Sequence, residues 1–177
     1  MSINAAIIYG TETGNTEYIA DLMKKEWNED IDVHNVLNMD LAIFEQYELL
    51  ILGIPSWYDG QLQDDWDEIF EDLETLNFKD KIIAIYGLGD QQDWGLYFVD
   101  ALGALARKLL SQGAILIGEW PIEGYQFVES LGINDAGNFY GLALDEDWQS
   151  ELSEERIKTW LTQVKTEFGH LQQLKVA

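Results

Sequence analysis

The sequence contains no cysteine, and this absence excludes several classes of chemistry. Disulfides, iron–sulfur clusters and thiol catalysis all require cysteine. Histidine is almost as scarce, because the chain has only His34 and His170, which are not spaced as a pair of zinc ligands. We therefore expect no metal site. A redox function would require a bound organic cofactor, because no side chain present cycles reversibly between oxidation states at ordinary potentials.

Basic residues are also few in this chain. Asp and Glu number 33 against 10 Lys and Arg, which gives a formal net charge of −23, and no Lys or Arg occurs between residues 26 and 78. Such a surface repels nucleic acids and anionic membranes, and it favours basic partners at a rate that salt reduces. The alternative is that the acidic excess serves solubility alone. We expect no nucleic-acid or membrane partner.

Long apolar runs are absent as well. No stretch approaches the length that spans a membrane, and the first residues, Met-Ser-Ile-Asn-Ala-Ala, lack the basic start and apolar stretch of a secretory signal. We therefore expect a cytoplasmic protein. With 177 residues, of which 47% are hydrophobic, the chain is long enough for one domain with a sizeable core.

Apolar segments alternate with segments of helical periodicity along the chain. Residues 49–54 form a continuous apolar run that ends at Pro55, which is typical of a strand buried on both faces. Further strands are expected at residues 5–9, 33–37, 81–87 and 114–117, with helices between them. This alternation predicts an α/β fold, namely a three-layer, doubly wound, five-stranded parallel sheet.

Residues 118–141 interrupt the alternation. They are rich in glycine and aromatic residues and show no helical period. Residues 142–144 then resemble a strand again, so we interpret the segment as an insertion that splits the fifth strand. Because the sequence has no repeat, linker or second apolar pattern, we expect residues 1–177 to form a single domain.

The segment Gly10–Thr16 follows the first strand, precedes the first helix and is the strongest candidate for a binding site. The first N–H groups of a helix have no intrahelical partner, and the helix dipole places partial positive charge there. Threonine and asparagine side chains add donors, and two glycines let the backbone close around a ligand. We interpret the loop as a phosphate site. The alternative is a threonine-rich helix N-terminus that binds no ligand.

The spacing of this loop limits which phosphate it can hold. A nucleoside triphosphatase loop requires G-x-x-x-x-G-K-[ST], whereas Gly10 and Gly14 are one residue too close and Asn15 stands where Lys is needed. The G-x-G-x-x-G motif of dinucleotide sites does not occur after the first strand either. A loop that offers only hydroxyl, amide and backbone donors suits one terminal monophosphate.

Two further loops are expected at the same end of the sheet. Residues 55–60 place Trp57 and Tyr58 directly after a buried strand, and residues 87–97 contain Trp94. Ligands of doubly wound folds bind at the carboxyl ends of the strands. Aromatic residues in loops beside a phosphate loop favour a flat heterocycle held between them. The alternative is that these side chains pack in the core or anchor the surface.

In several separate motifs the sequence resembles the flavodoxins, specifically their long-chain bacterial and algal type. The matching segments follow the family's order over nearly the whole chain: Gly10–Thr16, Ile54–Trp57, Gly87–Gln91, Trp120–Pro121, Gly124–Tyr125 and Gly141–Asp147. A split fifth strand distinguishes the long-chain members. The resemblance implies a flavodoxin-like fold and a non-covalently bound FMN.

The resemblance also implies which residues bind the FMN. The phosphate would lie on the first loop, the isoalloxazine ring would lie between Trp57 and an aromatic residue of the third loop, and Asp147 would reach the ribityl hydroxyls. The implied cofactor-binding residues are Thr11, Glu12 (through its backbone N–H), Thr13, Gly14, Asn15, Thr16, Pro55, Ser56, Trp57, Tyr58, Asp59, Gly60, Leu88, Gly89, Asp90, Trp94, Tyr97 and Asp147. No residue is expected to be catalytic.

Two positions depart from the family pattern. The stacking residue of the third loop is usually Tyr, whereas this chain has Trp94 at the matching position and Tyr97 nearby. The register favours Trp94. The second departure is Leu88, which replaces a small or polar residue and would make that edge of the site more apolar.

These features predict a low-potential, one-electron carrier. Asp59, Asp90 and Asp147 would disfavour additional negative charge on a reduced flavin. The resemblance implies that a peptide in the 58–60 turn can rotate to accept a hydrogen bond from the ring, helped by Gly60 and by an Asp59 that tolerates left-handed backbone.

The acidic stretch Asp59–Glu74 is expected to dock the basic faces of the electron-transfer partners. These partners would be a flavodoxin or ferredoxin–NADP reductase and the enzymes that accept the electrons, and each encounter would be transient. The alternative function is that of an FMN-dependent NAD(P)H quinone or nitro reductase on the same fold.

Overall fold

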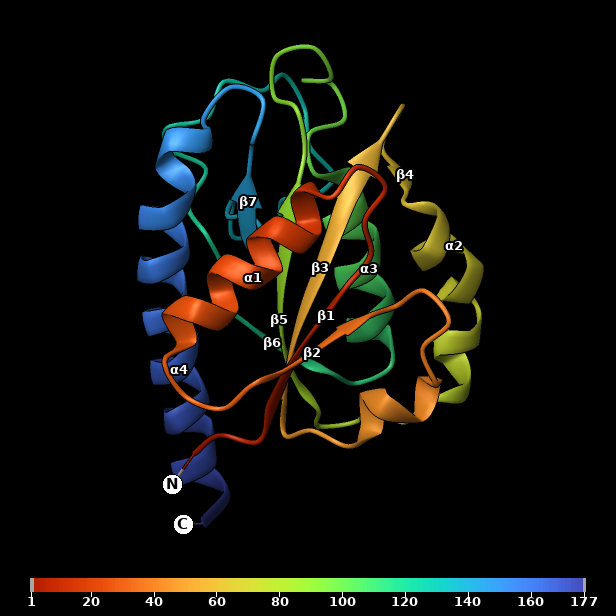
Figure 1. The fold of residues 1–177 in the computed structure, drawn as a ribbon, viewed down its shortest axis with the longest axis vertical. Helices are drawn as coiled ribbons and strands as arrows, with labels where there is room; N and C mark the ends of the chain where they lie inside the picture. The colour runs from red at the N-terminus through yellow and green to blue at the C-terminus, as the bar shows by residue number, and fades with distance from the viewer. Residues whose placement is uncertain (1, 177) are drawn as a thin grey trace.

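A computed structural model describes residues 2–176, and its centre is a parallel β-sheet (Figure 1). The strands run in the order β2-β1-β3-β5, and β6 and β7 together complete the fifth position. Their bounds are β1 Ala5–Tyr9, β2 Asp32–Asn35, β3 Leu49–Trp57, β5 Ile82–Leu88, β6 Ile115–Ile117 and β7 Leu142–Leu144. The predicted doubly wound, five-stranded parallel sheet is confirmed.

Helices cover both faces of the sheet and bury alternate residues of each central strand. Leu49 and Ile51 of β3 share one apolar cluster with residues of α1 (Asn15–Trp27) and α4 (Ser153–Val176). Leu50, Leu52 and Ile54 share the opposite cluster with residues of α2 (Asp64–Phe70) and α3 (Asp100–Ser111). Because side chains alternate across a strand, an uninterrupted apolar run supplies both cores at once.

The fifth strand is split as the sequence predicted. β6 pairs with Ile82–Ala84 of β5, and β7 pairs with Tyr86–Leu88 of the same strand. Residues 118–141 separate the two halves and return to the sheet at Gly141. A Cβ at this glycine would lie 1.9 Å from the Ile85 carbonyl oxygen, so only glycine fits there.

β3 is longer than predicted, and this changes the position of Trp57. The strand does not end at Pro55 but continues to Trp57, and β4 (Gln61–Leu62) returns antiparallel beside its last two residues. β1 ends opposite Gly53, so the Pro55 nitrogen faces an open side where no ladder bond is required. Trp57 is therefore the last residue of a strand and does not stand in a loop.

Other boundaries differ by a few residues. The second strand covers Asp32–Asn35 rather than 33–37, and the fourth strand predicted from sequence covers Ile82–Leu88 rather than 81–87. Three short 3-10 helices, η1 (Leu41–Glu45), η2 (Asp72–Thr75) and η3 (Ser150–Leu152), lie in the connections. Among the helices of residues 2–176, none combines the length and apolar character needed to cross a membrane.

Candidate functional site

A cavity of about 360 Å³ lies at the carboxyl ends of β1, β3 and β5. This is the position at which doubly wound sheets bind ligands. The cavity wall combines the first loop, the end of β3, the loop after β5 and the segment after β7. The lining residues are Thr11, Glu12, Thr13, Asn15, Thr16, Pro55, Ser56, Trp57, Tyr58, Leu88, Gly89, Asp90, Trp94, Tyr97, Glu146 and Asp147.

The first loop ends at the N-terminus of α1, where backbone donors are available. Gly14 immediately precedes the helix, has φ 95° and offers no side chain to cap it. The first regular helical bond runs from the Tyr18 N–H to the Gly14 carbonyl, at 2.9 Å. The N–H groups of Asn15 and Thr16 therefore have no intrahelical acceptor and can serve an anion.

Thr11 closes this loop upon itself. Its hydroxyl oxygen accepts a hydrogen bond from the Gly14 N–H at 3.0 Å. A hydroxyl that accepts one bond retains its own proton for a second partner. Thr11 can therefore fix the loop and still donate into the cavity.

Two contacts hold the ends of the loop on the sheet. The Gly10 N–H donates to the Gly53 carbonyl at 3.1 Å, and the Tyr86 hydroxyl donates to the Thr16 carbonyl at 3.2 Å. Tyr86 is completely buried, and burial raises the pKa of its phenol well above the ordinary value, so it remains a donor. The loop is thus anchored at both ends before any ligand binds.

No Lys or Arg occurs among the residues that line the cavity in the described part of the chain. An anion bound here would depend on backbone N–H groups, on hydroxyls and amides, and on the dipole of α1. Such a site offers the kinds of donor that we expect for one monophosphate, and it does not provide the Lys that cradles a triphosphate.

The other end of the cavity is aromatic. Trp57 and Tyr58 lie with ring centroids 6.2 Å apart and planes inclined at 55°, and Trp94 and Tyr97 lie on the loop after β5. Pro55 and Leu88 add apolar wall between them. The Trp57 Nε1 is buried and makes no hydrogen bond to any described residue. A flat, partly polar ring fits this space because the walls are apolar and a donor remains available.

The 58–60 turn has left-handed backbone at two of its three residues. Tyr58 has φ 44° and Gly60 has φ 81°, whereas Asp59 does not have a positive φ. In this turn the left-handed backbone therefore lies at Tyr58 and Gly60, and the expected rotation of a peptide within residues 58–60 stays a prediction. The Gly60 N–H donates to the Tyr58 carbonyl at 2.8 Å, which makes the turn tight. A Cβ at Gly60 would lie 2.7 Å from a carboxylate oxygen of Asp100.

Buried hydrogen bonds fasten the loop after β5 to the segment after β7. Asp145 is fully buried, and one of its carboxylate oxygens accepts from the Gln91 backbone N–H at 3.1 Å and from the Gln91 side chain at 2.8 Å. The other oxygen accepts from the backbone N–H groups of Asp147 and Trp148. Asp145 therefore fixes one wall of the cavity relative to another.

Acidic groups surround this wall. The Asp90 carboxylate accepts hydrogen bonds from the Trp148 indole at 3.0 Å and from two backbone N–H groups of its own loop. Burial raises the pKa of Glu146, and burial together with Asp90, Asp145 and Asp93 raises the pKa of Asp147. The cavity thus lies in a negative electrostatic environment.

The structure brings most of the predicted site residues around one cavity. Gly14, Asp59 and Gly60 are not on its wall, although each adjoins residues that are. Sequence reasoning missed Glu146, which lines the cavity beside Asp147, and missed the supporting residues Gln91, Asp100 and Asp145. The acidic triplet 145–147 was the signal for Glu146, but nothing in the sequence tells which of its carboxylates faces the cavity.

Comparison with known proteins gives a consistent result. The family model described as Flavodoxin matches residues 7–160. Flavodoxin of Klebsiella pneumoniae is 44% identical over 172 residues, which cover 97% of this chain and 97% of that protein. Flavodoxin 1 of Escherichia coli (strain K12) is 43% identical over 169 residues, which cover 95% of this chain and 96% of that protein.

Solved structures extend the similarity to three dimensions. The crystal structure of Fusobacterium nucleatum flavodoxin bound to flavin mononucleotide superposes with a TM-score of 0.89 at 32% identity. The match covers 94% of this chain and 99% of the other. Both sequence and fold are therefore similar over nearly the whole length.

Proposed function

Because this chain belongs to the flavodoxin family, an FMN-binding family of electron carriers, we propose that the cavity described above is its FMN site. The protein is an electron-transfer protein and not an enzyme. FMN supplies the one-electron chemistry when it is bound, because the chain itself has no redox-active centre. The residues around the cavity bind the cofactor and set its electrostatic environment.

The FMN proposal rests mainly on one observation, namely that a single cavity has a polar end and an aromatic, apolar end. At one end, Thr11, Thr13, Asn15 and Thr16 offer donors without any cation, which suits a terminal monophosphate. At the other end, aromatic and apolar side chains suit a flavin ring. FMN has a phosphate and a flat heterocycle, joined by a ribityl chain that can run past Asp90 and Asp147.

Flavin titration of the apoprotein tests the proposal. We expect FMN to bind with quenching of its fluorescence, and riboflavin to bind at least about tenfold more weakly because it lacks the phosphate. Equal affinities would remove the phosphate role of the first loop. No binding of either flavin would remove the proposal itself.

We propose that the acidic residues of the cavity wall make the fully reduced state of bound FMN unfavourable. The protein would then be a strong electron donor. Asp90, Glu146 and Asp147 lie on the cavity wall, and no basic residue of the wall offsets them. Like charges disfavour the addition of another negative charge. Reductive titration at controlled potential measures this property directly. A potential for the last electron close to that of free FMN would contradict it.

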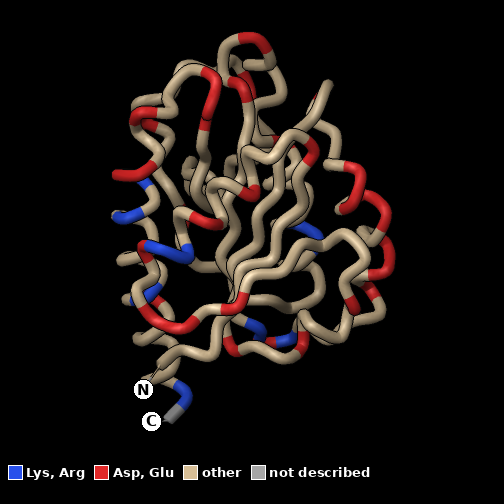
Figure 2. The backbone as a smooth tube through the Cα atoms, viewed as in Figure 1, with Lys and Arg blue, Asp and Glu red and all other residues tan. Residues whose placement is uncertain are grey.

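We propose that the partners are basic faces of a flavodoxin or ferredoxin–NADP reductase and of acceptor enzymes. Acidic residues run along α2, as Figure 2 shows, and only β4 and Gln63 separate this helix from the 58–60 turn, whose Tyr58 lines the cavity. Asp64 and Asp67 are exposed in the first turn of this helix. Encounters steered by such charges are fast, weak and sensitive to salt.

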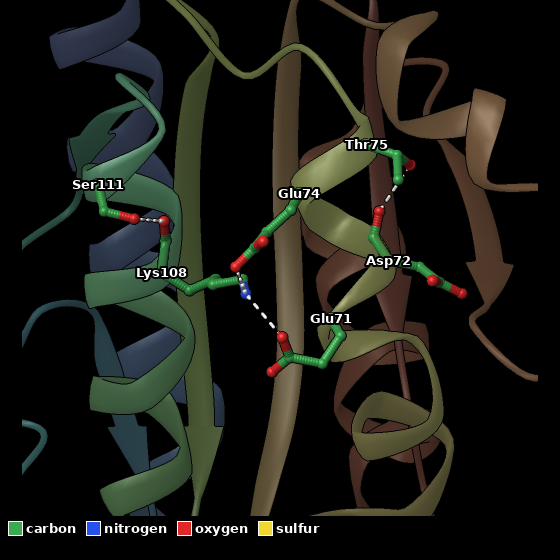
Figure 3. Close-up of polar contacts among 6 residues, drawn as sticks. All are labelled: Glu71, Asp72, Glu74, Thr75, Lys108 and Ser111. Atoms are coloured by element: carbon green, nitrogen blue, oxygen red, sulfur yellow. Dashed lines mark hydrogen bonds and ion pairs between the residues drawn. The ribbon is translucent and has the colours of Figure 1, made fainter.

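The far end of this acidic surface is partly neutralised. Lys108 of α3 lies 2.6 Å from the Glu74 carboxylate and 3.8 Å from that of Glu71 (Figure 3). The uncompensated charge therefore concentrates at the start of α2, close to the cavity. This supports docking at Asp64 and Asp67 rather than over the whole stretch from Asp59 to Glu74.

Charge reversal at two pairs of exposed acids separates docking from net charge. We expect Asp64→Lys with Asp67→Lys to slow electron transfer from a reductase at low salt by about tenfold or more. The matched control is Glu26→Lys with Asp30→Lys, which changes the net charge equally at the end of α1 farthest from the cavity. Equal slowing in both variants would mean that net charge alone matters.

The alternative of an FMN-dependent quinone or nitro reductase has less support. Such an enzyme needs a second cofactor site, and the wall residues offer no basic group for a dinucleotide phosphate. We further propose that the protein works in the cytoplasm, without nucleic-acid or membrane partners. The charge of −23 supports the latter point, because it repels both kinds of polyanion.

A further inference from the structure

Gln63 is a fully buried polar residue that connects two loops of the site. It is 1% exposed and directly precedes α2. Its Nε2 donates to the Glu12 carboxylate at 3.0 Å and to the Asp65 carboxylate at 2.8 Å. Its Oε1 accepts from the Trp66 N–H at 3.4 Å. One side chain thus caps a helix and also reaches into the phosphate loop.

The backbone of the phosphate loop lies directly against this amide. A Cβ at Gly10 would lie 2.1 Å from the Gln63 Oε1, so the loop begins with no space between it and the glutamine. The Gly53 carbonyl, which accepts from Gly10, also accepts from the Trp66 indole at 2.9 Å. The start of α2 therefore supports the first loop through two residues, Gln63 and Trp66.

Glu12 presents an electrostatic problem in this position. It places a carboxylate within a loop proposed to bind a phosphate dianion, and no basic residue lines the cavity in the described chain. A carboxylate that moved freely above the loop would repel the phosphate strongly, because the attraction of N–H dipoles is shorter in range than charge repulsion. The Glu12 side chain therefore has to be held at a fixed place.

We propose that Gln63 is a positioning residue, which holds the Glu12 carboxylate against the start of α2 and away from the phosphate. This inference rests on the proposed FMN site. It assigns to a residue outside the cavity wall a role in the affinity for the phosphate rather than for the flavin ring. Only an amide side chain suits the position, because it must accept from the Trp66 N–H and donate to Glu12 without adding charge.

A shortened amide gives the test with the least structural change. Gln63→Asn keeps a good helix cap but withdraws the amide from Glu12 by one methylene. We expect it to lower the affinity for FMN about tenfold and the affinity for riboflavin less than about twofold, because riboflavin lacks the phosphate. Gln63→Met, which has no amide, should give the same selective loss.

A double-mutant cycle with Glu12→Gln tests whether the charge of Glu12 causes the loss of FMN affinity. We expect the effect of Gln63→Asn on FMN affinity to shrink at least about fivefold when Glu12 is already neutral, and to shrink in high salt. A role in folding alone would lower both flavin affinities together and would not depend on Glu12.

The outcomes separate this inference from the proposed function. Equal losses for FMN and riboflavin, or a loss that Glu12→Gln leaves unchanged, would overturn the role of Gln63 while the FMN site stands. Failure of the unmodified apoprotein to bind FMN would overturn the site itself.

Discussion

Trp94 and Tyr97 show how closely two residues can compete for one role. Both lie on the cavity wall, and Trp94 is 46% exposed despite its size. The register of the resemblance favours Trp94 as the residue that covers the outer face of the flavin. An exposed indole beside a cavity is unfavourable in water, and a bound ring would cover it.

Alanine substitution should distinguish the two residues. We expect Trp94→Ala to weaken FMN binding by about tenfold or more, because stacking and burial are both lost. Tyr97→Ala should weaken it by less than about threefold if Tyr97 only borders the site. Fluorescence titration of each apoprotein measures both effects, and the reverse order would assign the stacking role to Tyr97.

Glu146 gives a prediction about pH and stability. Burial raises the pKa of its carboxyl in the folded protein above the ordinary value of 4.5. The folded state therefore holds this proton more tightly than the unfolded state does. Its stabilising contribution is complete below pH 4.5 and is lost as the pH rises through the raised pKa.

Replacing the Glu146 carboxyl by an uncharged amide should remove this loss of stability at rising pH. We expect Glu146→Gln to reduce the fall in the free energy of unfolding of the apoprotein between about pH 5 and 7, since the amide still accepts from Ser153 and carries no charge. Chemical denaturation across this range gives the measurement. Glu151→Gln, at an exposed glutamate on η3, serves as the control. An identical pH profile for the wild type and Glu146→Gln would contradict the assignment.

At the scale of elements, the pattern of apolar residues predicted the strands better than did a single residue that often ends a strand, such as Pro55. The apolar runs placed the central strands to within a few residues because both faces of these strands are buried. Pro55 misled as a strand end, because a sequence does not show where the neighbouring strand stops. Trp57 was assigned to a loop for the same reason. Glu146 and Gln63 escaped notice because their roles depend on contacts distant in sequence.

Gly141 gives a prediction at this scale, since β7 can lie beside β5 only if this residue has no side chain. A Cβ there would overlap the Ile85 carbonyl oxygen at 1.9 Å. We expect Gly141→Ala to lower the free energy of unfolding by about 3 kcal/mol. Denaturant unfolding of the apoprotein measures the change.

Gly169 provides the matched control for that substitution. It lies within α4, and a Cβ there would have no neighbour within 4 Å. We expect Gly169→Ala to raise the free energy of unfolding by about 0.5–1 kcal/mol, because alanine favours a helix. A loss of similar size in both variants would show that the β7 contact is not the cause.

At the scale of the whole molecule, charge is the dominant feature. The net charge is −23. Among residues 2–176, Lys108 and Lys165 are the only basic residues that form ion pairs with carboxylates. Most acidic residues of this part of the chain therefore belong to no ion pair, and Figure 2 shows acidic positions along much of the backbone with few basic ones beside them. Such self-repulsion opposes the compact state and is reduced when salt screens it.

Salt should therefore stabilise the folded apoprotein. We expect its Tm to rise by about 3 °C or more between about 10 mM and 500 mM sodium chloride. Thermal unfolding followed by circular dichroism gives the measurement. Sodium chloride is preferable to sulfate, because sulfate also strengthens apolar burial. A Tm that falls with salt would mean that attractive pairs outweigh the repulsion.

The divided edge strand has a consequence for how the chain could be shortened. Ile117 pairs opposite Ala84 and Leu142 opposite Tyr86, so a single position of the sheet, the one opposite Ile85, separates the two half-strands. Excision of residues 118–141 with a one-residue bridge would leave an uninterrupted strand. Phe139, however, is wholly enclosed and meets the Phe98 ring at 5.9 Å. The backbone would thus tolerate the deletion, whereas Phe98, two residues before α3, would lose its aromatic partners.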